Sequence, residues 1–239
     1  MCIRDRTLVN RRKSGASLTA AGVRLSRYAS TISDLWQQAR SETALPQGFN
    51  SIVNLGCHRD LWTGSGELLL QTIRTINPDA AVHISIGHDD DIHSWLKDGL
   101  SDIALSYGAL HNSDYHHTAL HEDQLTLVST QVNSPIRFDP GYVFIEAGEE
   151  FGQAHAAAYS DAGTAQISFS SSQHGLEFIL KHGGSAYLPR RIVEQAINAK
   201  KLFILKDAPV FTRTAYLICN KTMKSEWTWF NECLEQLRN

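Results

Sequence analysis

The chain has 239 residues, of which 42% are hydrophobic and 20% charged, which is ordinary for a globular protein of one or two domains. No apolar run approaches the roughly 18 residues that a bilayer-spanning helix needs, and the N-terminus lacks the apolar core of a secretory signal. The four cysteines are scattered without a CxxC pair, which argues against a disulfide framework or zinc site and favours a cytoplasmic location.

Charge is distributed unevenly along the chain. The first forty residues carry eight Lys or Arg and two Asp, whereas the remainder carries fourteen basic and twenty-three acidic residues. The N-terminal part therefore suits a polyanion, which would repel the rest of the chain. A basic tail without such a partner is the alternative interpretation.

The N-terminal segment predicts a wing followed by a long helix. Residues 1–6 fit no periodic pattern, and the basic residues Arg11, Arg12 and Lys13 before Ser14-Gly15 indicate a turn or the tip of a β-wing. Thr19 or Ser17 is a suitable N-cap for the helix that follows, and Pro46 and Gly48 mark its end. Its apolar residues recur at steps of three and four, as in a coiled coil: Leu18, Ala21, Leu25, Tyr28, Ile32, Leu35 and Ala39. This stripe predicts pairing with a second chain; packing against its own domain is the alternative.

Beyond residue 50 the pattern alternates between strands and helices. Strands are predicted at 52–55, 82–86, 103–105, 125–128, 143–145, 167–169, 186–188, 202–205 and 215–218. Helices are predicted at 61–76, 90–97, 173–181 and 190–198, with a last amphipathic helix at about 226–237 on which Trp227, Phe230 and Leu234 share a face. Such alternation predicts an α/β fold of mainly parallel sheets covered by helices.

Several of these segments resemble the LysR-type transcription regulators. In that family an Arg-bearing wing is followed by LTxxG, here Leu18 to Gly22, and then by a long dimerising helix. The segment 96–105 (LKDGLSDIAL) resembles the family's LxxGxxDxxI/L signature, with Gly99 and Asp102 in place. The segment 179–193 resembles its VxxGxGxxxLP signature, with Gly183 and Pro189 in place. Segments 76–87 and 212–221 are also similar, so the resemblance extends from about Thr7 to the C-terminus. Shorter matches at 36–40, 61–62 and 151–155 resemble members linked to flagellar genes.

The resemblance implies a division of the chain. Residues 1–17 would be the remnant of a winged helix-turn-helix, 18–45 the linker and dimerisation helix, and 50–239 an effector-binding domain with a periplasmic-binding-protein-like (type 2) fold. Subdomain one would comprise 50–124 and 211–239, and subdomain two 125–205, joined by strands near 124–129 and 206–212. The family places a helix-turn-helix before the wing, and nothing before Thr7 supplies it. We therefore expect Arg11, Arg12 and Lys13 to contact DNA phosphates without base readout, and the chain to be a homodimer or homotetramer.

The resemblance also implies an effector site in the cleft between the subdomains, where strand ends meet helix N-termini. Arg59 could clamp a carboxylate, or it could pair with Asp60 or Asp89. Ser171 to Gln173 could cap a helix, with or without ligand contact, and Asp89 to Asp91 indicate a solvated helix start. The candidate effector residues are Arg59, Asp60, Trp62, His88, Asp89, Ser106, Tyr107, Glu146, Ser172 and Gln173.

Other functions find little support in the sequence. There is no Walker loop, GxSxG elbow or HExxH motif, so no catalytic residues, cofactor or metal are expected. Gly64-Ser65-Gly66 indicates a loop at a helix start. The histidines His111, His116, His117 and His121 indicate a mobile surface loop rather than a metal site. The alternative function is a solute-binding protein of the periplasmic type 2 fold, against which the absent signal and the basic heptad helix argue.

Overall fold

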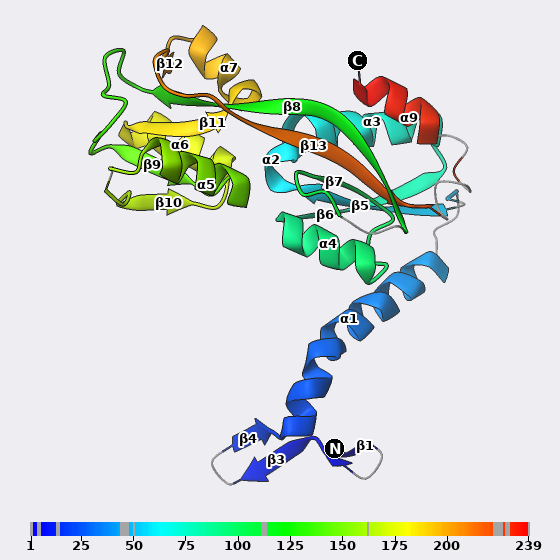
Figure 1. Cartoon of the computed structure of the whole chain (residues 1–239). Coiled ribbons are helices and arrows are strands. Elements are labelled where there is room, and N and C mark those ends of the chain that lie inside the picture. The colour runs from blue at the N-terminus through cyan, green and yellow to red at the C-terminus, as the bar shows by residue number, and fades with distance from the viewer. Residues whose placement is uncertain are drawn as a thin grey trace.

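The computed structural model describes residues 2–3, 6–12, 15–43, 48–49, 51–110, 114–161, 163–221, 227 and 230–238. Lys13, Pro46 and His111 lie outside these residues, as do the side chains of Arg11 and Arg12. Two lobes lie side by side, and a long helix carries a small hairpin away from them (Figure 1).

The N-terminal part consists of two short strand pairs and the long helix. Strands β1 (Cys2–Ile3) and β2 (Arg6–Thr7) pair antiparallel, as do β3 (Val9–Arg12) and β4 (Gly15–Leu18). The predicted wing is therefore a hairpin, and the predicted helix follows it as α1 (Ala20–Thr43). The pairing of β1 with β2 was not predicted, because segments of two residues are too short to show a period.

The junction between hairpin and helix explains the LTxxG sequence. Thr19 caps α1, because its Oγ1 accepts a hydrogen bond from Gly22 N at 3.0 Å. The same hydroxyl donates to the Thr7 carbonyl at 2.7 Å, and Thr19 N donates to Leu8 O at 3.0 Å. A Cβ on Gly22 would lie 2.1 Å from the Leu8 carbonyl oxygen, so only glycine lets the strand approach the helix this closely.

The first lobe is a parallel β-sheet of three strands, to which β13 adds antiparallel. Helices α3 and α9 cover one face, around Leu55, Leu69 and Phe230, while α4 covers the other, around Ile92 and Ile218. Its elements are β5 (Ser51–His58), α2 (Arg59–Leu61), the π-turn η1 (Trp62–Gly66), α3 (Glu67–Ile76), β6 (Ala80–Gly87), α4 (Asp89–Lys97), β7 (Ile103–Ser106), β13 (Phe211–Asn220) and α9 (Phe230–Arg238).

The second lobe repeats the three-layer arrangement. Helices α6 and α7 pack on one sheet face around Ile145, Ile179 and Val193, and α5 packs on the other around Phe151 and Tyr187. Its elements are β9 (Tyr142–Ile145), α5 (Glu149–Ala158), β10 (Ile167–Phe169), α6 (Ser172–His182), β11 (Ser185–Pro189), α7 (Arg190–Asn198) and β12 (Phe203–Ile204).

Strands β8 (Tyr115–Ser129) and β13 connect the lobes (Figure 1). They pair antiparallel from Asn220 opposite Tyr115 to Phe211 opposite Leu125, with a register shift between Thr214 and Tyr216. They join the two half-sheets into the order β10-β9-β11-β8-β13-β7-β5-β6, with β12 beside β8. The prediction of mainly parallel sheets was therefore right within each lobe and wrong for the connecting strands.

One sequence-based prediction is wrong, and one helix was missed. His116, His117 and His121 do not lie in a mobile loop: they belong to β8, where Cys219 lies opposite His116. Helix α5 was not predicted, because Phe151 is its only buried residue and the apolar period is correspondingly weak.

In the described part of the chain, no helix is both long and apolar enough to span a membrane.

Candidate functional site

The candidate site lies where the two lobes meet, at the C-terminal ends of β5, β6 and β7. Strand β5 ends at His58, immediately before α2. Strand β6 is followed by His88 and α4, and β7 ends at Ser106. From the second lobe, the N-termini of α6 and α7 contribute Ser172 and Arg191. A polar cluster therefore forms between segments that are far apart in sequence.

Asp60 is the central ion of this cluster. Its carboxylate accepts hydrogen bonds from Ser172 N at 3.0 Å and Ser172 Oγ at 2.7 Å, and pairs with Arg213 Nη2 at 3.0 Å. Burial by itself would raise the pKa of Asp60, but Arg213 and Ser172 outweigh it and hold that pKa below its usual value. A first-lobe anion thus occupies the N-terminus of a second-lobe helix, a position that favours negative charge.

A second set of contacts links Asp123, on β8, to the same arginines. Arg191 Nε lies 3.3 Å from Asp123 Oδ1, and the Tyr107 hydroxyl donates to Asp123 Oδ2. The Arg213 guanidinium stacks 3.7 Å from the centre of the Tyr107 ring. Arg191 also donates to the carbonyls of Thr63 and Asp60, so α7 is tied to the turn after β5. Each aspartate is therefore neutralised by an arginine, as burial requires.

Arg59 differs from the other two arginines. Its Nη1 donates to Ser170 Oγ in the second lobe at 3.3 Å, while its buried Nε has no hydrogen-bond partner among the described residues. Within that same part of the chain, no carboxylate lies at ion-pair distance from it. The alternative of a salt bridge to Asp60 or Asp89 is therefore wrong, and Arg59 keeps a charge and a donor for another group.

The other predicted residues divide into two groups. Asp89 accepts hydrogen bonds from Ser106 Oγ at 2.5 Å and Tyr107 N at 3.0 Å, so it is not a solvated helix start, although Asp90 and Asp91 are exposed. His88 lies beside His58, with ring centres 5.9 Å apart. The structure therefore brings Arg59, Asp60, His88, Asp89, Ser106, Tyr107 and Ser172 to the junction.

Three of the predicted effector residues make no contact at the junction between the lobes. Trp62 packs against the first-lobe core, the exposed Gln173 bonds to Glu177, and the exposed Glu146 uses its backbone N to bond Phe169. Ser171 caps α6 by accepting from His174 N at 3.4 Å. Capping by Ser171 is thus confirmed, and Ser172 rather than Gln173 faces the junction.

Asp123, Arg191, Arg213 and the role of His58 were not predicted from the sequence. A signal existed for two of them. Arg213 alternates in sequence with buried Ala215 and Leu217, so these side chains point to the same strand face. Asp123 is related in the same way to buried Leu125 and Leu127. A charged residue in phase with a buried strand face indicates a buried ion pair. Arg191 carries no comparable signal, because its partners lie in the other lobe.

Burial lowers the pKa of His58 from 6.5 to about 4, although Asp89 and Asp60 oppose the shift and Arg213 and His88 add to it. The unfolded chain therefore takes up a proton at His58 before the folded chain does, so stability falls as the pH drops from 6.5 towards 4. From pH 7 to pH 5 this loss should be about 2 kcal/mol.

We expect His58→Asn to reduce that loss, because asparagine does not titrate and still offers an oxygen to Asp60 N, which now donates to His58 Nδ1 at 3.2 Å. Urea unfolding at pH 7 and pH 5 measures the effect. An equal loss in both proteins would show that His58 titrates normally in the fold.

Metal and thiol chemistry find no support in this part of the molecule. No group of three or more His, Cys, Asp or Glu residues with metal-binding geometry occurs among the described residues. Burial raises the pKa of the Cys57 thiol to about 12, which keeps it protonated and unreactive.

Comparisons with known proteins agree with this architecture. The family of LysR substrate binding domains matches residues 47–237. Among curated proteins, the HTH-type transcriptional regulator HdfR of Escherichia coli O45:K1 is 25% identical over 217 residues, which cover 88% of this chain and 75% of HdfR.

Solved structures of the same fold include two regulators. The bromide-bound regulatory domain of HypT from Salmonella typhimurium has a TM-score of 0.65 at 18% identity, covering 81% of this chain and 98% of that one. Full-length LysG from Corynebacterium glutamicum, with bound effector Arg, has a TM-score of 0.63 at 14% identity, covering 97% and 82%. At these identities the structural likeness concerns the fold alone.

Proposed function

Because this chain belongs to the LysR-type transcription regulators, which sense small-molecule effectors, we propose that its effector is a small carboxylate bound between the two lobes beside Arg59. The observation that carries this proposal is the asymmetry of the junction. Asp60 and Asp123 already form ion pairs with arginines. Arg59 forms no ion pair among the described residues, and its guanidinium donates a hydrogen bond across the junction to Ser170 of the other lobe. A carboxylate is the group that a guanidinium with a free donor binds best.

Two neighbours hold ligands that are negatively charged or contain a carboxylate. The HypT regulatory domain holds bromide, and LysG holds Arg, which carries an α-carboxylate although its net charge is positive. In this chain, the effector would either replace or strengthen the hydrogen bond between Arg59 and Ser170, which lies just before the N-terminus of α6. An effector that binds two lobe arrangements with different affinity shifts the balance between them.

The shift between lobe arrangements would reach DNA through the N-terminal part of the chain. The chain would divide into a wing (1–17), a linker helix (18–45) and an effector-binding domain with subdomains at 50–124 with 211–239 and at 125–205. Two copies would pair through α1, and the hairpin bearing Arg11, Arg12 and Lys13 would contact phosphates. Movement of the lobes would then change how paired helices present the DNA-binding part of the regulator.

A thermal-shift screen with small carboxylates and amino acids tests the effector site. A compound at about 100 times its Kd should stabilise the folded chain by about 2.7 kcal/mol. Arg59→Ala should weaken its binding about 10- to 100-fold, because a charge-assisted hydrogen bond is lost. Arg74→Ala, which removes an exposed positive charge on α3, is the matched control. A response that survives in Arg59→Ala and Arg74→Ala alike would move the effector away from the junction.

A further inference from the structure

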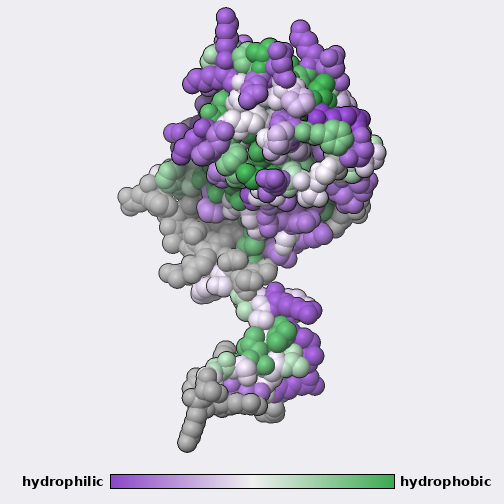
Figure 2. Space-filling view, turned by 90° about the vertical axis from the view of Figure 1, so that its left-hand side faces the viewer, coloured by the Kyte–Doolittle hydropathy of each residue, from purple (hydrophilic) through white to green (hydrophobic). Residues whose placement is uncertain are grey.

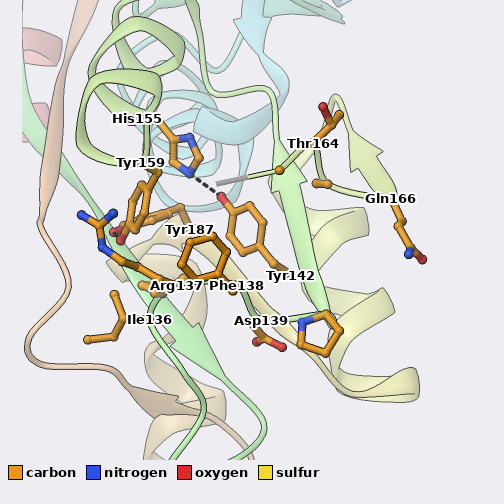
Figure 3. A pocket seen from close by; sticks show the side chains of 14 residues that line it. Ile136, Arg137, Phe138, Asp139, Tyr142, His155, Tyr159, Thr164, Gln166 and Tyr187 are labelled. Carbon is orange, nitrogen blue, oxygen red and sulfur yellow. Dashed lines mark hydrogen bonds between the residues drawn. The ribbon is translucent and has the colours of Figure 1, made fainter. Parts of the chain in front are cut away.

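A cavity of about 300 Å³ lies within the second lobe, and none of the junction residues described above lines it (Figure 3). It is bounded by the end of α5, by β9 and β11, and by segments 136–140 and 163–166. Its volume is in the range of small-molecule sites. The lining comprises Leu127, Ile136, Arg137, Phe138, Asp139, Pro140, Tyr142, His155, Tyr159, Gly163, Thr164, Ala165, Gln166 and Tyr187.

Aromatic rings form the wall of this cavity. Tyr142 and His155 stack with ring centres 5.7 Å apart, and the Tyr142 hydroxyl lies 2.9 Å from His155 Nε2 (Figure 3). Tyr159 and Tyr187 form a second pair, with their hydroxyls 2.6 Å apart. The faces of such rings carry negative electrostatic potential, which attracts cations.

The hydroxyl groups offer acceptors rather than donors. Tyr187 donates to the Pro209 carbonyl at 3.0 Å, so the proton between the two tyrosines belongs to Tyr159. Both hydrogens are used, and lone pairs remain on Tyr159 Oη. Burial lowers the pKa of His155 and raises that of Tyr142, so both stay neutral near pH 7 and neither repels a cation.

The charges around the cavity favour a cation as well. Arg137 pairs with Asp161 at 2.5 Å, and its guanidinium already lies 5.3 Å over the Tyr159 ring. The Asp139 carboxylate accepts from Ser134 Oγ, Ser185 Oγ and Gly141 N, but within the described residues no cation lies at ion-pair distance. One carboxylate beside an aromatic wall is therefore left without a counter-charge.

We propose that this cavity is a second ligand site, which binds a small organic ammonium compound with a compact apolar body. The cation would lie against the rings of Tyr142 and Tyr187, within the field of Asp139, and the apolar body would contact Leu127 and Ile136. This site is independent of the carboxylate site at Arg59, and its ligand has the opposite charge.

Titration calorimetry with choline and its neutral carbon isostere, 3,3-dimethyl-1-butanol, tests the proposal on the whole chain. Choline should bind about 5- to 30-fold more tightly, because a desolvated cation–π contact is worth about 1–2 kcal/mol. Equal binding of the two compounds, or no binding of choline at about 10 mM, would overturn the proposal.

Variants locate the site. Asp139→Asn, which removes the charge at constant size, should weaken choline binding about tenfold. Because Asp139 also holds the turn to Gly141, a second variant is needed. Thr164→Phe fills the mouth of the cavity from an exposed position and should abolish binding. Arg59→Ala should leave choline binding unchanged, which separates this site from the junction. Unchanged binding in Thr164→Phe, or loss in Arg59→Ala, would contradict the assignment.

Discussion

Replacing Asp60 with alanine is expected to lower the free energy of unfolding by about 3–5 kcal/mol, the usual cost of leaving one partner of a buried ion pair uncompensated. For a domain of this size, this corresponds to a fall in Tm of roughly 6–20 °C. The reason is local: Arg213 loses its 3.0 Å partner, and Ser172 loses the acceptor for both its N–H and its hydroxyl.

The same variant should acquire anion dependence. Removing the carboxylate leaves a helix N-terminus, a hydroxyl and a guanidinium around a space that formate or acetate can fill. At constant ionic strength, either anion should raise the Tm of Asp60→Ala more than that of the wild type.

Asp161→Ala is the matched control for this experiment, because it removes an aspartate from an ion pair whose side chains are 48% and 56% exposed. Exposed pairs contribute at most about 1 kcal/mol. If Asp60→Ala were no less stable than Asp161→Ala, or showed no added response to formate, Asp60 would not tie the lobes as we describe.

Replacing Ile32 with glutamate is expected to dissociate the homodimer that we propose into monomers. Ile32 is 59% exposed, and its stripe neighbours Tyr28 and Leu35 are 65% and 40% exposed, so this part of the apolar stripe of α1 is not covered by the described part of its own chain. Figure 2 shows hydrophobic side chains on the narrow part of the molecule formed by α1 and the hairpin. A buried pair of like charges at this position should raise the dimer Kd roughly a thousandfold, equivalent to about 4 kcal/mol.

Size-exclusion chromatography with light scattering, over a dilution series, measures this change. Ser33→Glu introduces the same charge one residue further along α1, at an exposed position outside the stripe, and should leave the dimer intact. A wild-type chain that is monomeric at every concentration would instead overturn the proposal that two copies pair through α1.

The sequence predicted the alternating elements well because each strand or helix buries an apolar face with a local period. The capping of α1 by Thr19 was predictable for the same reason, since the residues involved are neighbours in sequence. The first half of β8 was not, because it forms a strand only through pairing with β13, where His116 and His117 lie opposite Cys219 and Ile218, about a hundred residues away.

The candidate site shows the same limit. Arg59 and Asp60 were identified from their place after a strand, but Asp60 pairs with an arginine 153 positions later, whereas Arg59 has no ion pair among the described residues. No local pattern distinguishes these two outcomes. Similarly, the cavity in the second lobe joins residues from five separate segments, and its aromatic wall includes α5, which the sequence did not predict.

The register shift in the connecting ribbon determines which charges meet between the lobes. Near the first-lobe end, Ala119 lies opposite Tyr216, whereas past the shift Asp123 lies opposite Arg213. Continued without the shift, the ladder would place Asp123 opposite Thr212, and the two charges would point to different faces of the ribbon. The bulge absorbs one extra residue on β8, between Ala119 and Glu122, and thereby keeps the acid opposite the arginine. Deleting Leu120 would leave a regular ladder in which Asp123 still lies opposite Arg213, but the ribbon between the lobes would lose the bend and added twist of the bulge.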